Sequence, residues 1–180
     1  MEDLSLHILD IAENSVTAGA KNIEIGIRED MNNDLLTLEI TDDGKGLRSV
    51  SPEKAADPFQ TTRTTRKVGL GLALLKQSAT ESNGALHIAA QPQRGTRVTA
   101  TFQLSHIDRK PLGNIAETII TLIAGWPAVD IVFRHERDGL SLLLDTKELK
   151  RLLGDMPLNS PAALDFIRRY LHQEEESLYQ

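Results

Sequence analysis

Two short apolar segments joined by a polar turn constrain the fold of this chain more than any other feature. The segments are residues 22–28 (NIEIGIR) and 35–40 (LLTLEI), and the turn between them is EDMNND. Runs of this length that are rich in isoleucine and leucine, bounded by turn-forming residues, predict β-strands. The sequence therefore predicts a pair of strands early in the chain.

Helical patterns lie on both sides of this strand pair. The apolar spacing predicts helices over residues 3–18 and 69–82, each followed by a stop that contains glycine. Further strands are predicted at residues 85–90 and 96–104. Residues 48–67 have no clear periodicity and are predicted to be mostly loop.

From residue 106 the pattern changes to that of a small α-β-β-α segment. The predicted elements are a helix at 114–124, a hairpin at 130–133 and 140–144, and helices at 149–153 and 160–171. The tail EEESLYQ is expected to fray. No low-complexity linker precedes this segment, so we expect it to pack against residues 1–105.

Composition excludes several classes of protein. The 180 residues are 40% hydrophobic and 26% charged, as in globular domains and unlike disordered chains. The absence of cysteine excludes disulfides, thiolate nucleophiles and zinc-thiolate or iron–sulfur sites. A formal net charge of −6 argues against nucleic-acid binding. No apolar run approaches the roughly 20 residues of a membrane helix, and the acidic start favours a cytoplasmic protein.

The first candidate site lies on the N-terminal helix. Asp10 and Asn14 are four residues apart and therefore share one helix face. The amide oxygen of Asn14 is a hard ligand suited to Mg²⁺ held mainly by phosphates and water, and a carboxylate one turn earlier can hold an attacking water or hydroxyl. A surface helix can carry the same polar residues without any such role.

Three later segments supply groups that suit a nucleotide. In Asp42-Asp43-Gly44-Lys45-Gly46, a carboxylate at a strand end can accept from an exocyclic amine, and the glycines let a flat base approach, although DDGKG is also an ordinary turn composition. The run Thr61–Lys67 suits a polyanion such as a triphosphate, although a solvated loop has the same composition. Gly69 and Gly71 mark a helix start, where backbone N–H groups favour phosphate.

In this order, the segments resemble the N, G1, F and G2 boxes of the GHKL ATP-binding superfamily, which includes histidine kinases, type II topoisomerases and MutL. The segment AENSVTAGA is similar to MutL, whereas the segments DPFQTTR and GLGLALL are similar to sensor histidine kinases. The segment GTRV resembles the last sequence box of the superfamily. The resemblance covers residues 1–105 and implies an α+β Bergerat-type fold, a mixed sheet with helices on one face. Residues 106–180 would be a small C-terminal extension of unknown role.

The resemblance implies ATP and Mg²⁺ as ligands and gives each candidate residue a role. Asp10 stands at the general-base position, Asn14 would coordinate Mg²⁺, and Asp42 would bind the adenine amino group. The other nucleotide-binding candidates are Gly44 and Gly46 at the base, Thr96 in support, Phe59 as lid anchor, Arg63, Arg66 and Lys67 near the β- or γ-phosphate, and Gly69 and Gly71 at the phosphates.

Two departures from the superfamily pattern bear on catalysis. Asp10 is one methylene shorter than the usual glutamate, which moves its carboxylate by about an ångström, and small displacements can cost large factors in rate. Lys67 stands where histidine kinases usually carry the first glycine of the G2 box. Binding tolerates these changes better than hydrolysis does.

Other chemistries lack their motifs in this sequence. There is no P-loop and no serine-nucleophile elbow, and the five histidines lack the spacing of metal ligands. His7 is interpreted as a structural residue rather than a phosphoacceptor, because kinases of this type carry that histidine on a separate helical hairpin.

The sequence thus predicts a histidine-kinase-like signalling protein that binds ATP and Mg²⁺ and transfers the γ-phosphoryl group to a separate protein, or hydrolyses ATP slowly. The alternative is a nucleotide-dependent binding switch, anti-sigma-like or MutL-like. A scaffold that has lost nucleotide binding is a third hypothesis. A protein partner in trans is expected and a homodimer is compatible with the resemblance, whereas nucleic acid and membrane insertion are not expected.

Overall fold

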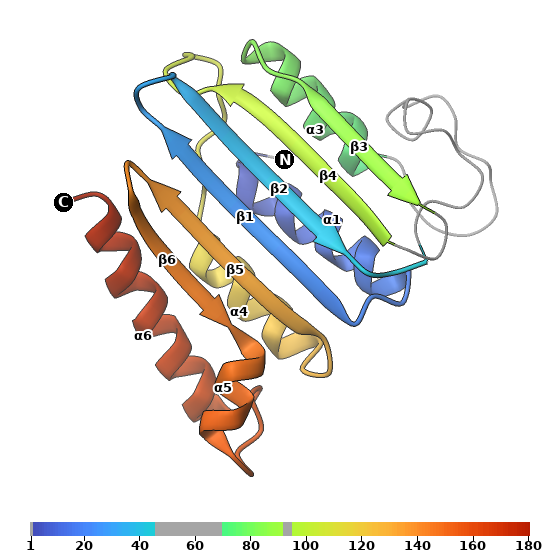
Figure 1. The fold of residues 1–180 in the computed structure, drawn as a ribbon, viewed down its shortest axis with the longest axis vertical. Coiled ribbons are helices and arrows are strands. Elements are labelled where there is room, and N and C mark those ends of the chain that lie inside the picture. The colour runs from blue at the N-terminus through green and yellow to red at the C-terminus, as the bar shows by residue number, and fades with distance from the viewer. Residues whose placement is uncertain (1, 46–69, 92–94) are drawn as a thin grey trace.

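The computed structural model describes residues 2–45, 70–91 and 95–180, which form one six-stranded mixed sheet (Figure 1). The strand order is β3-β4-β2-β1-β5-β6. The strands are β1 (Asn22–Asp30), β2 (Leu35–Asp42), β3 (Leu86–Gln91), β4 (Gly95–Gln103), β5 (Asp130–Arg137) and β6 (Leu140–Asp145). Neighbouring strands are antiparallel except for β1 and β5, which are parallel.

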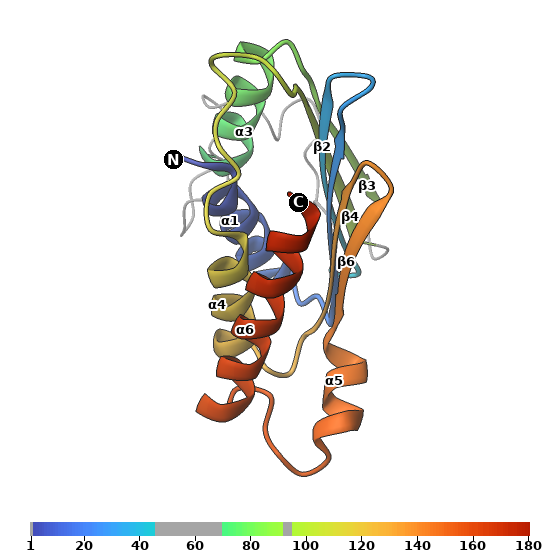
Figure 2. The ribbon, with the colours of Figure 1, turned by 90° about the vertical axis from the view of Figure 1, so that its left-hand side faces the viewer.

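The long helices cover one face of this sheet, as Figure 2 shows from the side. They are α1 (Leu4–Thr17), α3 (Leu70–Glu81), α4 (Ile115–Gly125) and α6 (Pro161–Leu178), while the short α5 (Thr146–Leu153) follows directly after β6. The predicted α+β architecture, a mixed sheet with helices on one face, is confirmed. Within the described ranges, no helix combines the length and the apolar character needed to cross a bilayer.

The core lies between the sheet and these helices. Burial alternates along β1, where Ile23, Ile25 and Ile27 are each 1% exposed, because successive strand residues face opposite sides of the sheet. Ile131 and Phe133 of β5 belong to the same buried cluster as the β1 isoleucines. Residues 106–180 therefore extend the sheet and the core that residues 1–105 begin.

Three sequence-based boundaries in the C-terminal part are wrong. The helix predicted at 149–153 begins three residues earlier, at Thr146, because Asp145 caps it. The strand predicted at 130–133 continues to Arg137, because its residues alternate and His135 is buried on the helix-covered face. The tail predicted to fray is helical to Leu178, which is only 5% exposed and packs into the core cluster. The end of this helix is also tied to β1, where Glu29 accepts a hydrogen bond from the Tyr179 hydroxyl, and the local sequence does not reveal so distant a partner.

Candidate functional site

One face of α1 carries the first two candidate residues. The helix begins after Asp3, whose side chain caps it by accepting a hydrogen bond from the Leu6 amide at 3.1 Å. Two and three turns after this cap, Asp10 and Asn14 are half-buried, and Asn14 Nδ2 donates to Asp10 Oδ2 at 3.2 Å. Within the described residues the oxygen of the Asn14 amide accepts no hydrogen bond, so it is the atom left available for a ligand.

The carboxylate of Asp42 meets the same helix from the end of β2. Asp42 is buried, and its Oδ2 accepts a hydrogen bond from the Ser15 hydroxyl at 2.8 Å. Its Oδ1 accepts from the Gly44 amide, also at 2.8 Å. Since Ser15 directly follows Asn14, this contact places two candidate segments that are distant in sequence side by side.

Two glycines make close approaches to these carboxylates. A Cβ on Gly44 would lie 3.0 Å from Asp42 Oδ1 and 3.2 Å from the Ala18 side chain at the end of α1. A Cβ on Gly71, in the first turn of α3, would overlap the carboxylate of Asp10. The start of α3 therefore packs directly against α1 at Asp10, and any side chain at Gly71 would have to displace that carboxylate.

The end of β2 is held from its other side by β4. Thr96 is the partner of Asp42 in the antiparallel register of these two strands. The preceding residue, Gly95, has a φ of 97°, and a Cβ there would overlap the Asp42 carbonyl oxygen. A left-handed conformation and this close approach together require glycine at position 95.

Asp43 has a structural task rather than a place in the candidate site. It accepts hydrogen bonds from the backbone amides of Lys21 at 2.7 Å and Asn22 at 2.9 Å, and from the Asn22 side chain at 2.5 Å. Burial raises the pKa of the Asp43 carboxyl, but these hydrogen bonds outweigh it and hold the pKa below its usual value. Asp43 thus fastens the turn after β2 to the start of β1.

The environment of Asp10 changes its acid–base behaviour. Burial raises the pKa of its carboxyl above the usual value, although the hydrogen bond from Asn14 opposes that shift. A carboxylate with a raised pKa is a better proton acceptor near neutral pH. The arrangement thus combines a basic carboxylate, an available amide oxygen and a buried carboxylate around one helix.

The structure brings some of the predicted site residues together, and others lie outside the residues that it describes. Asp10, Asn14, Asp42, Gly44 and Gly71 surround the second half of α1. Thr96 lies next to this group, in the strand paired with β2. The predicted residues Gly46, Phe59, Arg63, Arg66, Lys67 and Gly69 lie outside the described residues.

Sequence reasoning missed the role of Ser15, although the residue stands next to Asn14. Its side chain is 4% exposed, so its hydroxyl needs a partner inside the protein, which Asp42 supplies. The available signal was a serine on the apolar face of α1, four residues after Ile11. A buried hydroxyl at such a position indicates a polar partner on a facing element.

Comparison with known families identifies the N-terminal part. Residues 2–106 match the model of the family described as histidine kinase-, DNA gyrase B-, and HSP90-like ATPase. This stretch contains α1, both central strands, α3 and β4, and hence every described residue of the candidate site.

Curated relatives match over the same part of the chain. The non-motile and phage-resistance protein of Caulobacter vibrioides is 32% identical over 112 residues, which are 57% of this chain and 13% of that protein. A putative sensor histidine kinase, NtrY-like, of Rickettsia conorii is 29% identical over 110 residues, 61% of this chain and 18% of that protein. The chain thus spans less than a fifth of the length of these two relatives.

Two solved structures share the fold over a longer stretch. The N-terminal domain of a DNA repair protein has a TM-score of 0.55 and 16% identity, covering 88% of this chain and 59% of that one. The Aquifex aeolicus MutL ATPase domain complexed with ADP has a TM-score of 0.50 and 18% identity, covering 84% of this chain and 67% of that one. The likeness of fold therefore reaches beyond residue 106. With more than half of its residues matched by the family model, the chain belongs to the family of histidine kinase-, DNA gyrase B- and HSP90-like ATPases.

Proposed function

We propose that this chain binds ATP and Mg²⁺ around the second half of α1 and transfers the γ-phosphoryl group to a separate protein. One observation carries the proposal: Asp42 and Gly71, distant in sequence, both contact α1 within one turn of Asn14. A kinase-like use of ATP is further supported by the curated relative that is named a putative sensor histidine kinase.

Each described residue has a task in this proposal. Asp42 accepts two hydrogen bonds from the described residues and would accept a further one from the adenine amino group, while Gly44 would let the base approach the backbone. The oxygen of Asn14 fits Mg²⁺, because the amide nitrogen is already committed to Asp10 and a hard oxygen is the donor that Mg²⁺ prefers. Bound Mg²⁺ would neutralise charge on the phosphates.

The transfer itself needs little covalent chemistry from the protein. A nucleophilic side chain of the acceptor protein forms a bond to the γ-phosphorus, while the bond to the bridging oxygen breaks with its electron pair and ADP leaves. If water replaces the acceptor, its proton goes to the carboxylate of Asp10, whose raised pKa suits that role. Slow hydrolysis is the expected side reaction.

Calorimetric titration and phosphate transfer test the proposal in sequence. Wild-type protein is titrated with ATP in the presence of Mg²⁺, and Asn14→Ala should weaken ATP binding more with Mg²⁺ than in its absence. Labelled γ-phosphate is then offered to a cell extract, where one specific labelled protein that Asn14→Ala does not label supports the kinase. A folded protein that gives no binding heat would overturn the proposal.

A nucleotide-dependent binding switch is the second candidate, and the position of Asp10 favours it. Its carboxylate is paired with Asn14 and packed so tightly against Gly71 that no Cβ fits between them. A base that is already engaged in this way suits stable ATP binding better than rapid turnover. Tight ATP binding without labelling or hydrolysis would identify the switch.

A further inference from the structure

A side chain from the C-terminal part reaches the turn next to Asp42. Lys147, in the first turn of α5, donates from Nζ to Asn22 Oδ1 at 2.6 Å. The Asn22 amide nitrogen in turn donates to Asp43 Oδ2 at 2.5 Å. Lys147 lies outside residues 2–106, so this short polar chain connects the family-matched part to the segment that follows it.

The backbone around Lys147 is held in place by buried contacts. Thr146 is fully buried, and its hydroxyl accepts a hydrogen bond from the Ile131 amide at 2.8 Å. Asp145 caps α5 by accepting from the Lys147 amide at 2.7 Å. Because β5 is paired with β1, α5 begins in a fixed position relative to Asn22.

The chemistry of the lysine determines how Asn22 is oriented. An ammonium group only donates hydrogen bonds, so it selects the oxygen of the Asn22 amide and turns the NH₂ group toward Asp43. Rotation of that amide would bring its oxygen against the Asp43 carboxylate, which repels it. The lysine therefore stabilises the one orientation in which Asn22 holds Asp43, the residue between Asp42 and Gly44.

We propose that Lys147 is a positioning residue of the nucleotide site, acting through Asn22 and Asp43 on the turn that carries Asp42 and Gly44. This inference rests on the proposed function, since it assigns the C-terminal segment a part in holding the adenine. It predicts that loss of the Lys147 charge weakens the recognition of the base while leaving the rest of the fold intact.

Lys150 provides a matched control on the same helix. Lys150 Nζ lies 2.7 Å from the carboxylate of Asp130, and Lys147 Nζ lies 3.8 Å from the same carboxylate. In the part of the chain that the structure describes, only Lys147 of these two contacts Asn22. Lys147→Met and Lys150→Met thus each remove one positive charge next to Asp130. Only Lys147→Met also removes the hydrogen bond to Asn22.

The first test measures binding of ATP and of purine riboside triphosphate, which lacks the exocyclic amine. Lys147→Met should weaken ATP binding by about threefold to tenfold, the range of one ordinary hydrogen bond, because the lysine acts on the site only through Asn22 and Asp43. It should also reduce the preference for ATP over the analogue. Lys150→Met should change neither. On an Asn22→Ala background, Lys147→Met should add no further loss, because its path to the site is already broken.

The second test needs no nucleotide. Amide hydrogen exchange of Lys21, Asn22 and Gly44, whose N–H groups bond to Asp43 or Asp42, should be faster in Lys147→Met than in Lys150→Met at unchanged melting temperature. If wild-type protein binds ATP but the two variants agree in affinity, base preference and exchange, this inference fails alone. If wild-type protein does not bind ATP, the proposed function fails and the inference with it.

Discussion

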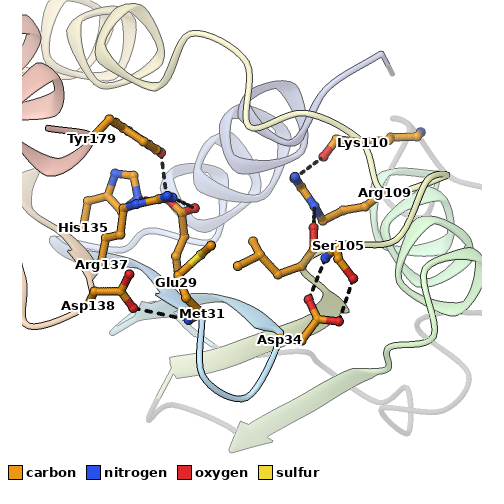
Figure 3. A network of polar contacts seen from close by, with 11 residues as sticks. Glu29, Met31, Asp34, Ser105, Arg109, Lys110, His135, Arg137, Asp138 and Tyr179 are labelled. Carbon is orange, nitrogen blue, oxygen red and sulfur yellow. Dashed lines mark hydrogen bonds and ion pairs between the residues drawn. The ribbon is translucent and has the colours of Figure 1, made fainter.

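The β1–β2 hairpin carries a buried carboxylate at each end, and their surroundings differ. Glu29, near the turn, accepts hydrogen bonds from His135 Nε2 at 2.9 Å, from Arg137 Nη1 at 2.6 Å and from the Tyr179 hydroxyl at 2.6 Å (Figure 3). Burial raises the pKa of the Glu29 carboxyl, but these partners outweigh it and hold the pKa below its usual value. The chain itself therefore compensates this charge.

Asp42, at the other end of the hairpin, has fewer hydrogen-bond donors around its carboxylate among the described residues. Its partners among the described residues are the Ser15 hydroxyl and the Gly44 amide, both neutral donors. A buried carboxylate with neutral partners and spare acceptor capacity is costly in the absence of a further donor. The difference teaches that burial alone does not mark a binding site, whereas an incomplete set of donors around a buried charge does.

Two buried histidines repeat this contrast. His135 has Nε2 bonded to Glu29, whereas His7, one turn before Asp10 on α1, is fully buried and has neither ring nitrogen bonded within the described residues. Burial, with a smaller contribution from the charge of Lys110, lowers the pKa of His7 to about 4. Among the described residues, the imidazole nearer the candidate site thus lacks a partner at both ring nitrogens, whereas the imidazole beside Glu29 lacks one at Nδ1 alone.

The largest expected effect comes from removing the compensated carboxylate. Glu29→Leu leaves Arg137 and His135 without their acceptor and should lower the free energy of unfolding by about 3–5 kcal/mol. At a temperature where the variant is folded, its affinity for ATP should be unchanged. Denaturant unfolding and calorimetry measure the two quantities.

Glu24→Leu is the matched control on the same strand, because Glu24 is exposed. Its unfolding free energy should change by less than about 0.5 kcal/mol. Equal losses for both variants would show that the cluster around Glu29 carries no special stability.

The pH dependence of stability tests the unsatisfied histidine. His7 has a pKa of about 4 in the folded protein and 6.5 in the unfolded chain, so between these pH values the unfolded chain takes up a proton that the folded one excludes. The contribution of neutral His7 to the free energy of unfolding is fully present above pH 6.5. It is lost as the pH falls toward 4, by about 3 kcal/mol in total.

Urea unfolding between pH 7.5 and 5 measures this slope, since the ordinary pKa values of carboxyl groups lie below that window. His7→Leu should flatten the curve there. A variant with the same slope as the wild type would contradict the burial of a neutral imidazole at this position.

The smallest expected effect concerns the hydroxyl of Tyr179. Burial and the contact with Glu29 raise its pKa, so the group remains a hydrogen-bond donor. Tyr179→Phe keeps the ring beside Arg137 but loses this bond, and should lower the unfolding free energy by about 1 kcal/mol. Tyr170→Phe, which loses an exposed bond to the Leu143 carbonyl, should lower it less. The reverse order would contradict the account of the cluster.

Local patterns in the sequence predicted much of the fold. The hairpin at 22–28 and 35–40 is present, and both strands are two residues longer, which makes Asp42 the last residue of β2. The parallel pairing of β5 with β1 was not predictable, because a short apolar run does not specify its neighbour. The helical structure of the tail was not predicted for a similar reason, since the Tyr179 hydroxyl bonds to Glu29, 150 residues away in the sequence.

The candidate site was predictable where a residue type implies a chemistry. Asp10, Asn14 and Asp42 were identified from their spacing and resemblance, and the structure places them around one helix. The contribution of Lys147 was not predictable, because an exposed lysine at a helix start has many uses and only the sheet order brings it to Asn22.

Asp42 is proposed to bind the amino group of a purine, and one thermodynamic cycle tests this role directly. ATP and purine riboside triphosphate are each titrated into wild-type protein and Asp42→Asn. The wild type should prefer ATP by about tenfold to a hundredfold, the range of a hydrogen bond to a charged group, and Asp42→Asn should bind both ligands equally. Equal binding by the wild type, or an undiminished preference in Asp42→Asn, would contradict the account.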